Sequence, residues 1–238
     1  MYNAFANIYD FVMRDTPYDA WVAYYEAVFQ RFHKNPKLIL DMGCGTGNIT
    51  ARLAQKGYDM IGLDSSFDML SKAKEKDASI LYLHMDMTDF ELYGTVDAMV
   101  SALDCVNYIT ADIDKLFALV YNYLNPGGIF IFDINSPYKL RKLLGNEPIV
   151  YDDDEMFYIW ENELEDSFCH FYISFFIREQ DGRYLRCDEM QTQRIYEVEE
   201  LENAAKKAGL IVHGIYDNLS FSPPKADSER LFFVIGKE

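Results

Sequence analysis

Short apolar runs alternate with stretches of helical spacing along the first 135 residues of the chain. Residues 38–40 are apolar and end at Asp41, and residues 60–63 are mostly apolar and end at Asp64. Between them, apolar side chains recur at helical spacing from residue 49 to 54. Short bounded runs indicate buried strands, whereas the wider spacing indicates a helix that buries one face. The pattern predicts further strands over residues 80–84, 97–102 and 129–134, with helices between them.

Strands that alternate with helices are joined by right-handed crossovers and form a parallel sheet. We therefore expect an α/β fold with a mostly parallel sheet that has helices on both faces. Residues 197–208 predict one more helix, and residues 210–216 and 230–236 predict two final strands. Residues 5–12 and 18–32 show helical spacing and precede the first strand.

The pattern changes between the fifth predicted strand and the last helix. Residues 157–164, 168–178 and 184–196 alternate in the way that is typical of antiparallel strands. Asp181 and Gly182 form a hairpin signal between the last two of them. We expect residues 145–196 to form a small antiparallel lobe that covers the substrate site. The core then comprises residues 1–144 and 197–238, with residues 1–36 as a helical cap.

Two features of this lobe have two interpretations each. Its aromatic side chains either line the site or form the lobe's own core or a dimer interface, because alternation sends only about half of them to each face. The acidic run at residues 152–155 either attracts a cationic acceptor or is a solvated loop. The aromatic candidates are Tyr158, Trp160, Phe171, Tyr172 and Phe175.

Three glycines follow the first strand within a few residues. Gly43, Gly45 and Gly47 lie between Asp41 and the next predicted helix. Glycine adopts positive φ and lacks a Cβ atom, so the chain can turn sharply and its backbone can contact a ligand. Asp64 ends the second strand about 20 residues after Gly43, the spacing of a carboxylate that binds a ribose diol. The unit predicts a site for an adenosine-containing ligand.

Two classes of adenosine-containing ligand are considered for this unit. A nicotinamide dinucleotide prefers the spacing G-x-G-x-x-G, in which amides at the helix start bind a pyrophosphate. Here the spacing is G-x-G-x-G, directly after an acid. The run from Asp41 to Gly47 resembles motif I of the class I S-adenosylmethionine-dependent methyltransferases, whose ligand carries no phosphate. The resemblance implies a Rossmann-like sheet of seven strands.

The resemblance also implies a set of cofactor contacts. The glycine turn would contact the amino-acid part of S-adenosylmethionine, and Asp41 would orient the turn and the ligand's amine. Asp64 and the start of the following helix would face the ribose. Asp86 would accept a hydrogen bond from the adenine amine, with Met87 against the ring. The expected cofactor-binding residues are Tyr9, Asp41, Gly43, Cys44, Gly45, Gly47, Asp64, Ser65, Met69, Asp86, Met87 and Leu103.

The N-terminal segment shares the resemblance. Many small-molecule methyltransferases begin with Y-x-x-F-A-x-x-Y-D, and this chain matches it with Tyr2, Phe5, Ala6, Tyr9 and Asp10. In the family this segment closes over the cofactor, which its second tyrosine contacts. The alternative is that these aromatic residues are only the apolar face of a packing helix.

The segment at the end of the fourth predicted strand is expected to lie near the reaction centre. Residues 100–108 resemble the V-S-x-L-D-x-x-N-Y form of bacterial small-molecule methyltransferases. This likeness places Leu103 at the methionine part of the cofactor and Asp104 and Tyr108 near its methyl group. We predict Asp104 and Tyr108 as catalytic residues that handle a proton and orient the acceptor.

Composition narrows the possible partners. The 238 residues include 22 Lys and Arg against 39 Asp and Glu, for a net charge of −17. Such a surface repels phosphate backbones and anionic membranes, which disfavours nucleic-acid and membrane binding. No apolar run approaches the ~20 residues that span a bilayer. No signal-peptide pattern begins the chain, so we expect a cytoplasmic protein. The four cysteines and four histidines show no metal-site spacing, and we expect no metal.

We therefore expect an S-adenosylmethionine-dependent methyltransferase that acts on a small-molecule acceptor, an amine, by in-line methyl transfer. Such a transfer requires alignment of the acceptor and exclusion of water. The alternatives are a noncatalytic S-adenosylmethionine-binding sensor or partner subunit, an RNA or protein methyltransferase, and a nicotinamide oxidoreductase.

Overall fold

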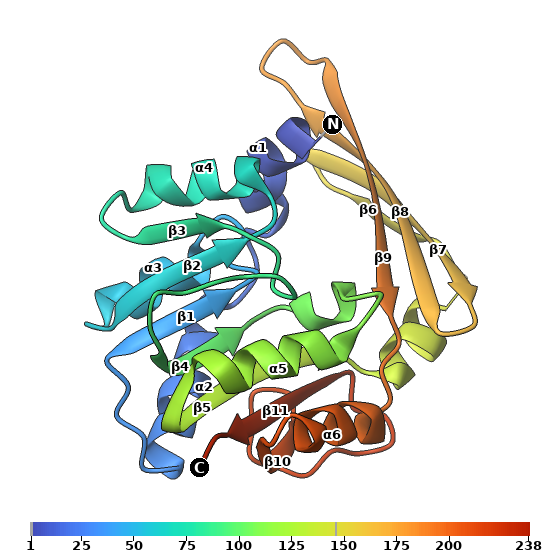
Figure 1. The fold of residues 1–238 in the computed structure, drawn as a ribbon. Helices are drawn as coiled ribbons and strands as arrows, with labels where there is room; N and C mark the ends of the chain where they lie inside the picture. Colours follow the sequence, from blue (N-terminus) through green and yellow to red (C-terminus); the bar gives the residue numbers. More distant parts are fainter. Residues whose placement is uncertain (1, 146) are drawn as a thin grey trace.

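A computed structural model describes residues 2–145 and 147–238, with side chains from Phe5 onward. This part of the chain contains a seven-stranded sheet with flanking helices and a separate four-stranded sheet (Figure 1). The α/β class, the mostly parallel main sheet and the additional antiparallel sheet are those that the sequence predicts. No helix among the described residues combines the length and the apolar character needed to cross a bilayer.

The main sheet has the strand order β10-β11-β5-β4-β1-β2-β3. Neighbours from β5 to β3 are parallel, whereas β11 is antiparallel to both β10 and β5. The last strand along the chain, β11, is therefore inserted between β10 and β5. The strands are β1 (Leu38–Met42), β2 (Asp59–Asp64), β3 (Leu81–His84), β4 (Val96–Ser101), β5 (Leu124–Asn135), β10 (Ile211–Asp217) and β11 (Arg230–Gly236).

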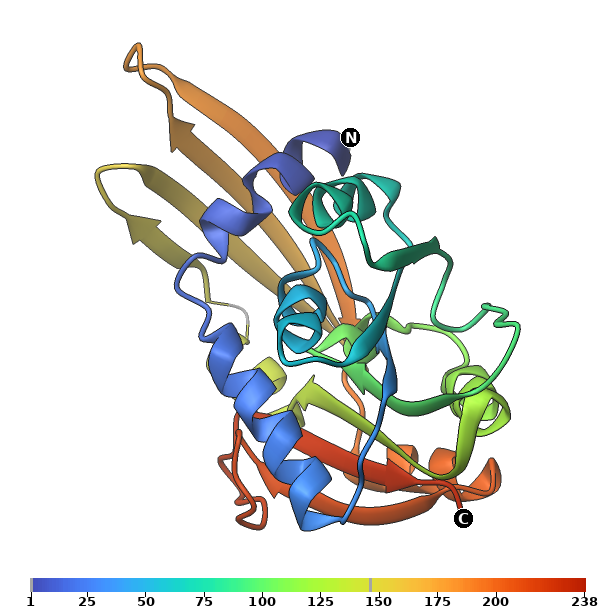
Figure 2. The ribbon, with the colours of Figure 1, turned by 90° about the vertical axis from the view of Figure 1, so that its left-hand side faces the viewer.

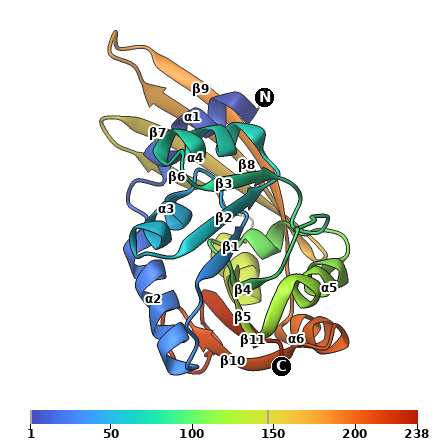
Figure 3. The same cartoon turned by 60° about the vertical axis from the view of Figure 1, so that its left-hand side comes forward.

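Each face of the main sheet is buried by its own helices. Successive residues of a strand point to opposite faces. Ile39 and Ile131 pack with α2 and α3, whereas Leu40 and Phe132 pack with α5 and α6. Figure 3 shows these two helical layers on either side of the sheet. The helical elements are α1 (Tyr2–Val12), α2 (Tyr18–Arg31), α3 (Asn48–Gln55), α4 (Phe67–Lys76), η1 (Cys105–Tyr108), α5 (Ile113–Tyr123), η2 (Lys139–Leu144) and α6 (Val198–Lys207).

Two strands differ from the sequence pattern. β5 begins at Leu124, ahead of the predicted start at residue 129, because Leu124 pairs with Val96 and the Gly127 N–H donates to Lys237 O over 2.7 Å. The pattern did not predict β6 (Ile149–Asp152), a short edge strand of the lobe.

The lobe is an antiparallel sheet in the order β6-β7-β8-β9. The predicted hairpin turn joins β8 to β9, where Gly182 has φ of +83° and the Asp181 side chain accepts from Arg183 N–H over 3.1 Å. Phe5 of α1 stacks on Phe175 of the lobe, with ring centroids 5.8 Å apart. Figure 2 shows α1 crossing the lobe's strands. The remaining strands are β7 (Met156–Glu165), β8 (Phe168–Arg178) and β9 (Tyr184–Arg194).

The lobe's aromatic side chains form its own core. Tyr158, Trp160, Phe171 and Phe175 pack in one cluster with residues of α1 and η2. Tyr172 follows Phe171 along β8 and so points to the other face, with 41% of its surface exposed. Four of the five aromatic candidates therefore belong to the lobe's own core, and other residues of the lobe line the cavity.

The acidic run at residues 152–155 includes the turn between β6 and β7. The Asp153 carboxylate accepts hydrogen bonds from the N–H groups of Glu155 and Met156, over 2.8 and 2.7 Å. It also forms an ion pair with Arg14 over 2.8 Å. The run therefore fixes the segment after α1 to the lobe.

Candidate functional site

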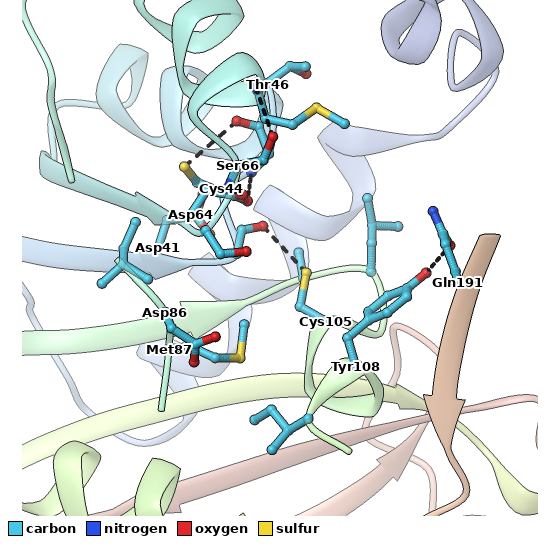
Figure 4. Close-up of a pocket in the computed structure, with 18 of the residues that line it drawn as sticks. Asp41, Cys44, Thr46, Asp64, Ser66, Asp86, Met87, Cys105, Tyr108 and Gln191 are labelled. Carbon is cyan, nitrogen blue, oxygen red and sulfur yellow. Dashed lines mark hydrogen bonds between the residues drawn. The ribbon is translucent and has the colours of Figure 1, made fainter. Parts of the chain in front are cut away.

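A cavity of about 580 Å³ lies where the carboxyl ends of β1, β2 and β4 face β9 of the lobe (Figures 1 and 4). Its volume is in the range of small-molecule sites. Ligands of open parallel sheets bind at this edge of the strands. The walls come from the glycine turn, the segments after β2, β3 and β4, the first two helices and β9.

The glycine turn is held by backbone hydrogen bonds to the end of β2. The N–H groups of Gly43 and Cys44 both donate to Leu63 O, over 2.8 and 2.9 Å. Gly43, Gly45 and Gly47 have φ of +72°, +54° and +76°. All three values lie in the left-handed region that glycine adopts at low cost, so the turn requires glycine on conformational grounds alone.

The three glycines differ in what surrounds them. A Cβ atom on Gly43 would lie 2.7 Å from Cys105 Sγ, and one on Gly47 would lie 2.9 Å from Tyr82 Oη. A Cβ on Gly45 would meet no described protein atom within 4 Å, and Gly45 lines the cavity. Gly45 thus leaves its backbone open to a ligand, whereas Gly47 packs against the protein outside the cavity lining.

Asp64 joins the glycine turn to the start of α4. Its two carboxylate oxygens accept hydrogen bonds from the N–H groups of Gly45 and Ser66, each over 2.8 Å. Ser66 caps α4, because its Oγ accepts Met69 N–H over 3.3 Å. Ser65 and Met69 both line the cavity, as the resemblance implies. Burial raises the pKa of Asp64, and the two N–H donors oppose that rise.

Asp41 is the last residue but one of β1, just before the turn, and is 1% exposed. Its Oδ2 accepts a hydrogen bond from Thr50 Oγ1 over 2.6 Å. Burial raises the pKa of Asp41 to about 7, the Thr50 hydrogen bonds oppose this rise, and the charge of Asp64 adds to it. Asp41 lines the cavity, so a ligand cation beside it would stabilise its ionised form.

Asp86 and Met87 follow β3 and line the cavity. One carboxylate oxygen of Asp86 accepts the N–H and the hydroxyl of Thr88, over 2.7 and 2.6 Å. These bonds close a tight turn that fixes the carboxylate at the cavity wall. Figure 4 shows Asp86 and Met87 next to each other at one side of the site.

Two tyrosines from the N-terminal helices line the cavity. Tyr9 was predicted, and burial raises its pKa well above the usual range. Tyr18 was not predicted, because its position after Pro17 indicated only a helix start. Tyr18 is 7% exposed, and within the described part of the chain its hydroxyl forms no hydrogen bond of good geometry. A ligand atom in the cavity can supply the missing partner.

Asp10 of α1 braces the glycine turn from outside the cavity. Its carboxylate accepts hydrogen bonds from Thr46 Oγ1 over 2.7 Å and Asn48 Nδ2 over 2.8 Å. It also forms an ion pair with Lys76 of α4 over 2.6 Å. The N-terminal motif contains Asp10, but its partners are distant in sequence, so spacing gave no signal for this contact.

The end of β4 is held in an unusual backbone conformation. Leu103 and Asp104 have φ of +59° and +56°, and each such non-glycine residue costs about 1–3 kcal/mol. The buried Asp133 carboxylate stabilises both, because it accepts Leu103 N–H over 2.9 Å and Asp104 N–H over 3.0 Å. Leu103 thereby lines the cavity, where it was predicted.

The two predicted catalytic residues are placed differently. The Asp104 carboxylate pairs with Arg230 over 2.8 Å and accepts Gln193 Nε2 over 2.5 Å. With these contacts, Asp104 is not among the residues that line the cavity, and its predicted part in proton transfer stays a prediction. Tyr108 lines the cavity, and its hydroxyl donates to Gln191 Oε1 over 2.7 Å (Figure 4).

β9 supplies a wall of the cavity that sequence reasoning did not assign. Glu189, Met190, Gln191 and Thr192 all belong to the lining. Alternation along the strand could place Glu189 and Gln191 on one face, but it could not show which face meets the site. The lining of the lobe side is therefore polar rather than aromatic.

Comparisons with known proteins agree with this geometry. A family model described as a methyltransferase domain matches residues 39–128. A Bacillus subtilis (strain 168) protein named as a methyltransferase, YqeM, is 36% identical over 100% of this chain and 97% of its own. The crystal structure of an S-adenosylmethionine-dependent methyltransferase from Clostridium acetobutylicum ATCC 824 is 37% identical, covers 99% of this chain and 98% of its own, and has a TM-score of 0.92. A Streptomyces venezuelae protein named dTDP-3-amino-3,4,6-trideoxy-alpha-D-glucopyranose N,N-dimethyltransferase is 31% identical over 40% of this chain and 41% of its own.

The raised pKa of Asp41 predicts a pH-dependent stability. A carboxyl group that titrates near 7 when folded and near 3.8 when unfolded stabilises the fold at low pH, and this contribution is lost as pH rises toward 7. Asp41→Asn keeps an acceptor for Thr50 and does not titrate. Between pH 5.5 and 8, ligand-free wild type should lose about 2 kcal/mol of unfolding free energy relative to this variant. Urea denaturation at both pH values measures the difference, and a constant difference would contradict the assignment.

The contacts of Asp10 predict that it holds α1 in place. Asp10→Ala removes the acceptor for Thr46 and Asn48 and the partner of Lys76, so α1 should open more often. We expect amide hydrogen exchange over residues 5–13 to become several-fold faster, with little change in the main sheet. Asp15→Ala, an exposed acid beyond α1, is the control. Equal exchange in the two variants would show that Asp10 does not anchor the helix.

Proposed function

The chain belongs to the class I S-adenosylmethionine-dependent methyltransferases, and on that basis we propose that it methylates the amine of a small molecule. The enzyme class and the cofactor follow from its relatives along the whole chain, and the acceptor is our proposal. One observation about the cavity supports the proposed acceptor. The cavity joins a cofactor side, made by the glycine turn and the acids after the strands, to a polar side that contains Tyr108 and Glu189.

The residues of the cavity fit S-adenosylmethionine. The backbone at Gly45 is open, the Tyr18 hydroxyl makes no hydrogen bond of good geometry with the described residues, and Asp41 is buried without an ion pair among them. Bound S-adenosylmethionine supplies a methyl group on a positively charged sulfur, which then leaves as a neutral sulfide. In our proposal, Gly45, Asp41 and the tyrosines hold its amino-acid part.

The remaining cofactor contacts follow from the strand ends. In our proposal Asp64 binds the ribose, beside Ser65 and Met69, and Asp86 accepts from the adenine amine with Met87 against the ring. These assignments use side chains that line the cavity in the order of their strands. Gly43 and Gly47 shape the turn, and Cys44 fills the space beneath it.

In our proposal, residues of the chain align the acceptor for methyl transfer and shield the reaction from water. Gln191 fixes the Tyr108 hydroxyl, so Tyr108 presents a defined hydrogen-bonding group to the acceptor. Leu103, Tyr9 and the lobe enclose the transfer region and exclude water, which favours an in-line displacement. An amine acceptor must lose its proton before its lone pair can attack, and a carboxylate in the cavity can assist this loss.

Two observations support an amine over other acceptors. The Streptomyces relative is named for the N-methylation of an amino sugar. The described lining contains Lys115 as its cation and five carboxylates, so it favours a positively charged group. The same charge disfavours RNA, whose phosphates would be repelled.

Release of S-adenosylhomocysteine tests the proposal. The full chain is incubated with S-adenosylmethionine and a panel of small amines, alcohols and carboxylates, and the released product is quantified. We expect turnover with at least one amine and little with the other classes. Equimolar binding of S-adenosylhomocysteine without turnover on any acceptor would instead favour a noncatalytic sensor or partner subunit.

A substitution at Asp64 tests the cofactor side. Asp64→Ala removes the proposed ribose acceptor and leaves the ligand's hydroxyls without their partner. Binding of S-adenosylhomocysteine should weaken by roughly 1–3 kcal/mol, measured by calorimetry. Asp59→Ala at the other end of β2 is the control, since Asp59 is exposed and far from the cavity lining. Equal affinity in both variants would remove Asp64 from the site.

A further inference from the structure

The lobe side of the cavity has a defined orientation. In the pairing of β8 with β9, Glu189 lies beside Ile173 and Gln191 lies beside Phe171. Ile173 and Phe171 belong to the lobe's buried cluster. Because cross-strand partners point to the same face, Glu189 and Gln191 also point inward, where both line the cavity.

Glu189 is connected to the predicted reaction centre through one side chain. Burial raises the pKa of Glu189, and a hydrogen bond with the Gln191 side chain opposes that rise. Gln191 in turn accepts the Tyr108 hydroxyl over 2.7 Å (Figure 4). The carboxylate is therefore held at the same end of the cavity as Tyr108, away from the glycine turn.

Glu189 has no cation beside it. The adjacent acid on the outer face, Asp188, pairs with Arg186 over 2.9 Å. No ion pair joins Glu189 to any Lys, Arg or His of the described residues, and no cation contributes to its pKa shift. A partly buried carboxylate without a counter-charge is stabilised when a cation binds to it.

The lining of the cavity as a whole is acidic. Lys115 is the cation among the described lining residues, and it is exposed. An anionic group that entered this side would meet unfavourable charge from several directions, whereas an ammonium group would be attracted. The other lining acids are Asp41, Asp64, Asp86 and Asp112.

We propose that Glu189 binds the ammonium group of the acceptor and that this cavity selects amines without a phosphate or carboxylate group. The inference rests on the proposed methylation of an amine and adds the residue that recognises it. It also separates this chain from the Streptomyces relative, whose name contains a nucleotide-linked sugar. The two phosphates of such an acceptor would enter a cavity whose described lining contains five carboxylates and Lys115.

Sinefungin tests Glu189 without knowledge of the acceptor. In this analogue of S-adenosylmethionine, a carbon atom with an amine replaces the sulfur and its methyl group, so an ammonium group points toward the acceptor side. Calorimetry on the full chain gives the dissociation constants of sinefungin and of S-adenosylhomocysteine. We expect wild type to bind sinefungin more tightly, and Glu189→Gln to reduce this preference about tenfold with S-adenosylhomocysteine affinity unchanged.

Two further variants control for charge and folding. Asp188→Asn makes the same change in charge on the outer face of the same strand and should keep the preference. Glu189→Asp keeps the carboxylate and should retain part of the preference, which also covers the case in which Glu189→Gln does not fold. A preference that is equal in wild type and in every folded Glu189 variant would overturn the proposal.

The acceptor side is tested with a matched pair of compounds. Glucosamine and glucosamine 6-phosphate differ by one phosphate, and both are offered to the full chain with S-adenosylmethionine. Faster turnover of the unphosphorylated amine supports the selection, and faster turnover of the phosphate overturns it. If neither compound is methylated, the preference for sinefungin over S-adenosylhomocysteine in wild type and the Glu189 variants decides whether the proposal stands.

Absence of S-adenosylhomocysteine binding would refute the proposed function, whereas binding with an unchanged preference would refute only the role of Glu189.

Discussion

The carboxylate of Asp133 connects the strands that shape the end of the cavity lined by Leu103 and Tyr108. It is fully buried at the end of β5, and it accepts the N–H groups of Leu103 and Asp104 in their left-handed conformations. Arg230 of β11 supplies the opposite charge that a buried carboxylate requires. Arg230 also binds Asp104, whose second oxygen accepts Gln193 of the lobe. Three strands of the core and one of the lobe therefore meet around one pair of buried charges.

Local patterns in the sequence were sufficient for most of the architecture. Apolar runs indicated the central strands because both faces of the sheet are buried, and the glycine turn identified the cofactor side because left-handed backbone favours glycine. Asp64 and Asp86 could be placed in the cavity from their positions at strand ends, since all parallel strands end at the same edge. What these predictions share is that each depends on the residue itself and on its immediate neighbours.

The contacts that were missed depend on residues distant in sequence. Asp104 follows β4, but Arg230 and Gln193 determine where its carboxylate points, and no local pattern contains them. Period-two alternation shows that Glu189 and Phe171 each occupy one face of a strand, but not which face meets the site. Tyr18 indicated only the start of a helix, because its place in the cavity lining depends on how that helix packs against distant segments.

The acidic lining has a consequence for turnover. A sulfonium ion is positively charged, and the sulfide left after transfer is not, so the same carboxylates attract the reactant form of the cofactor and hold its spent form less strongly. Differential affinity of this kind favours exchange of spent cofactor for fresh. If the cofactor binds as we propose, the acids that line the cavity would therefore lessen inhibition by the product through charge alone.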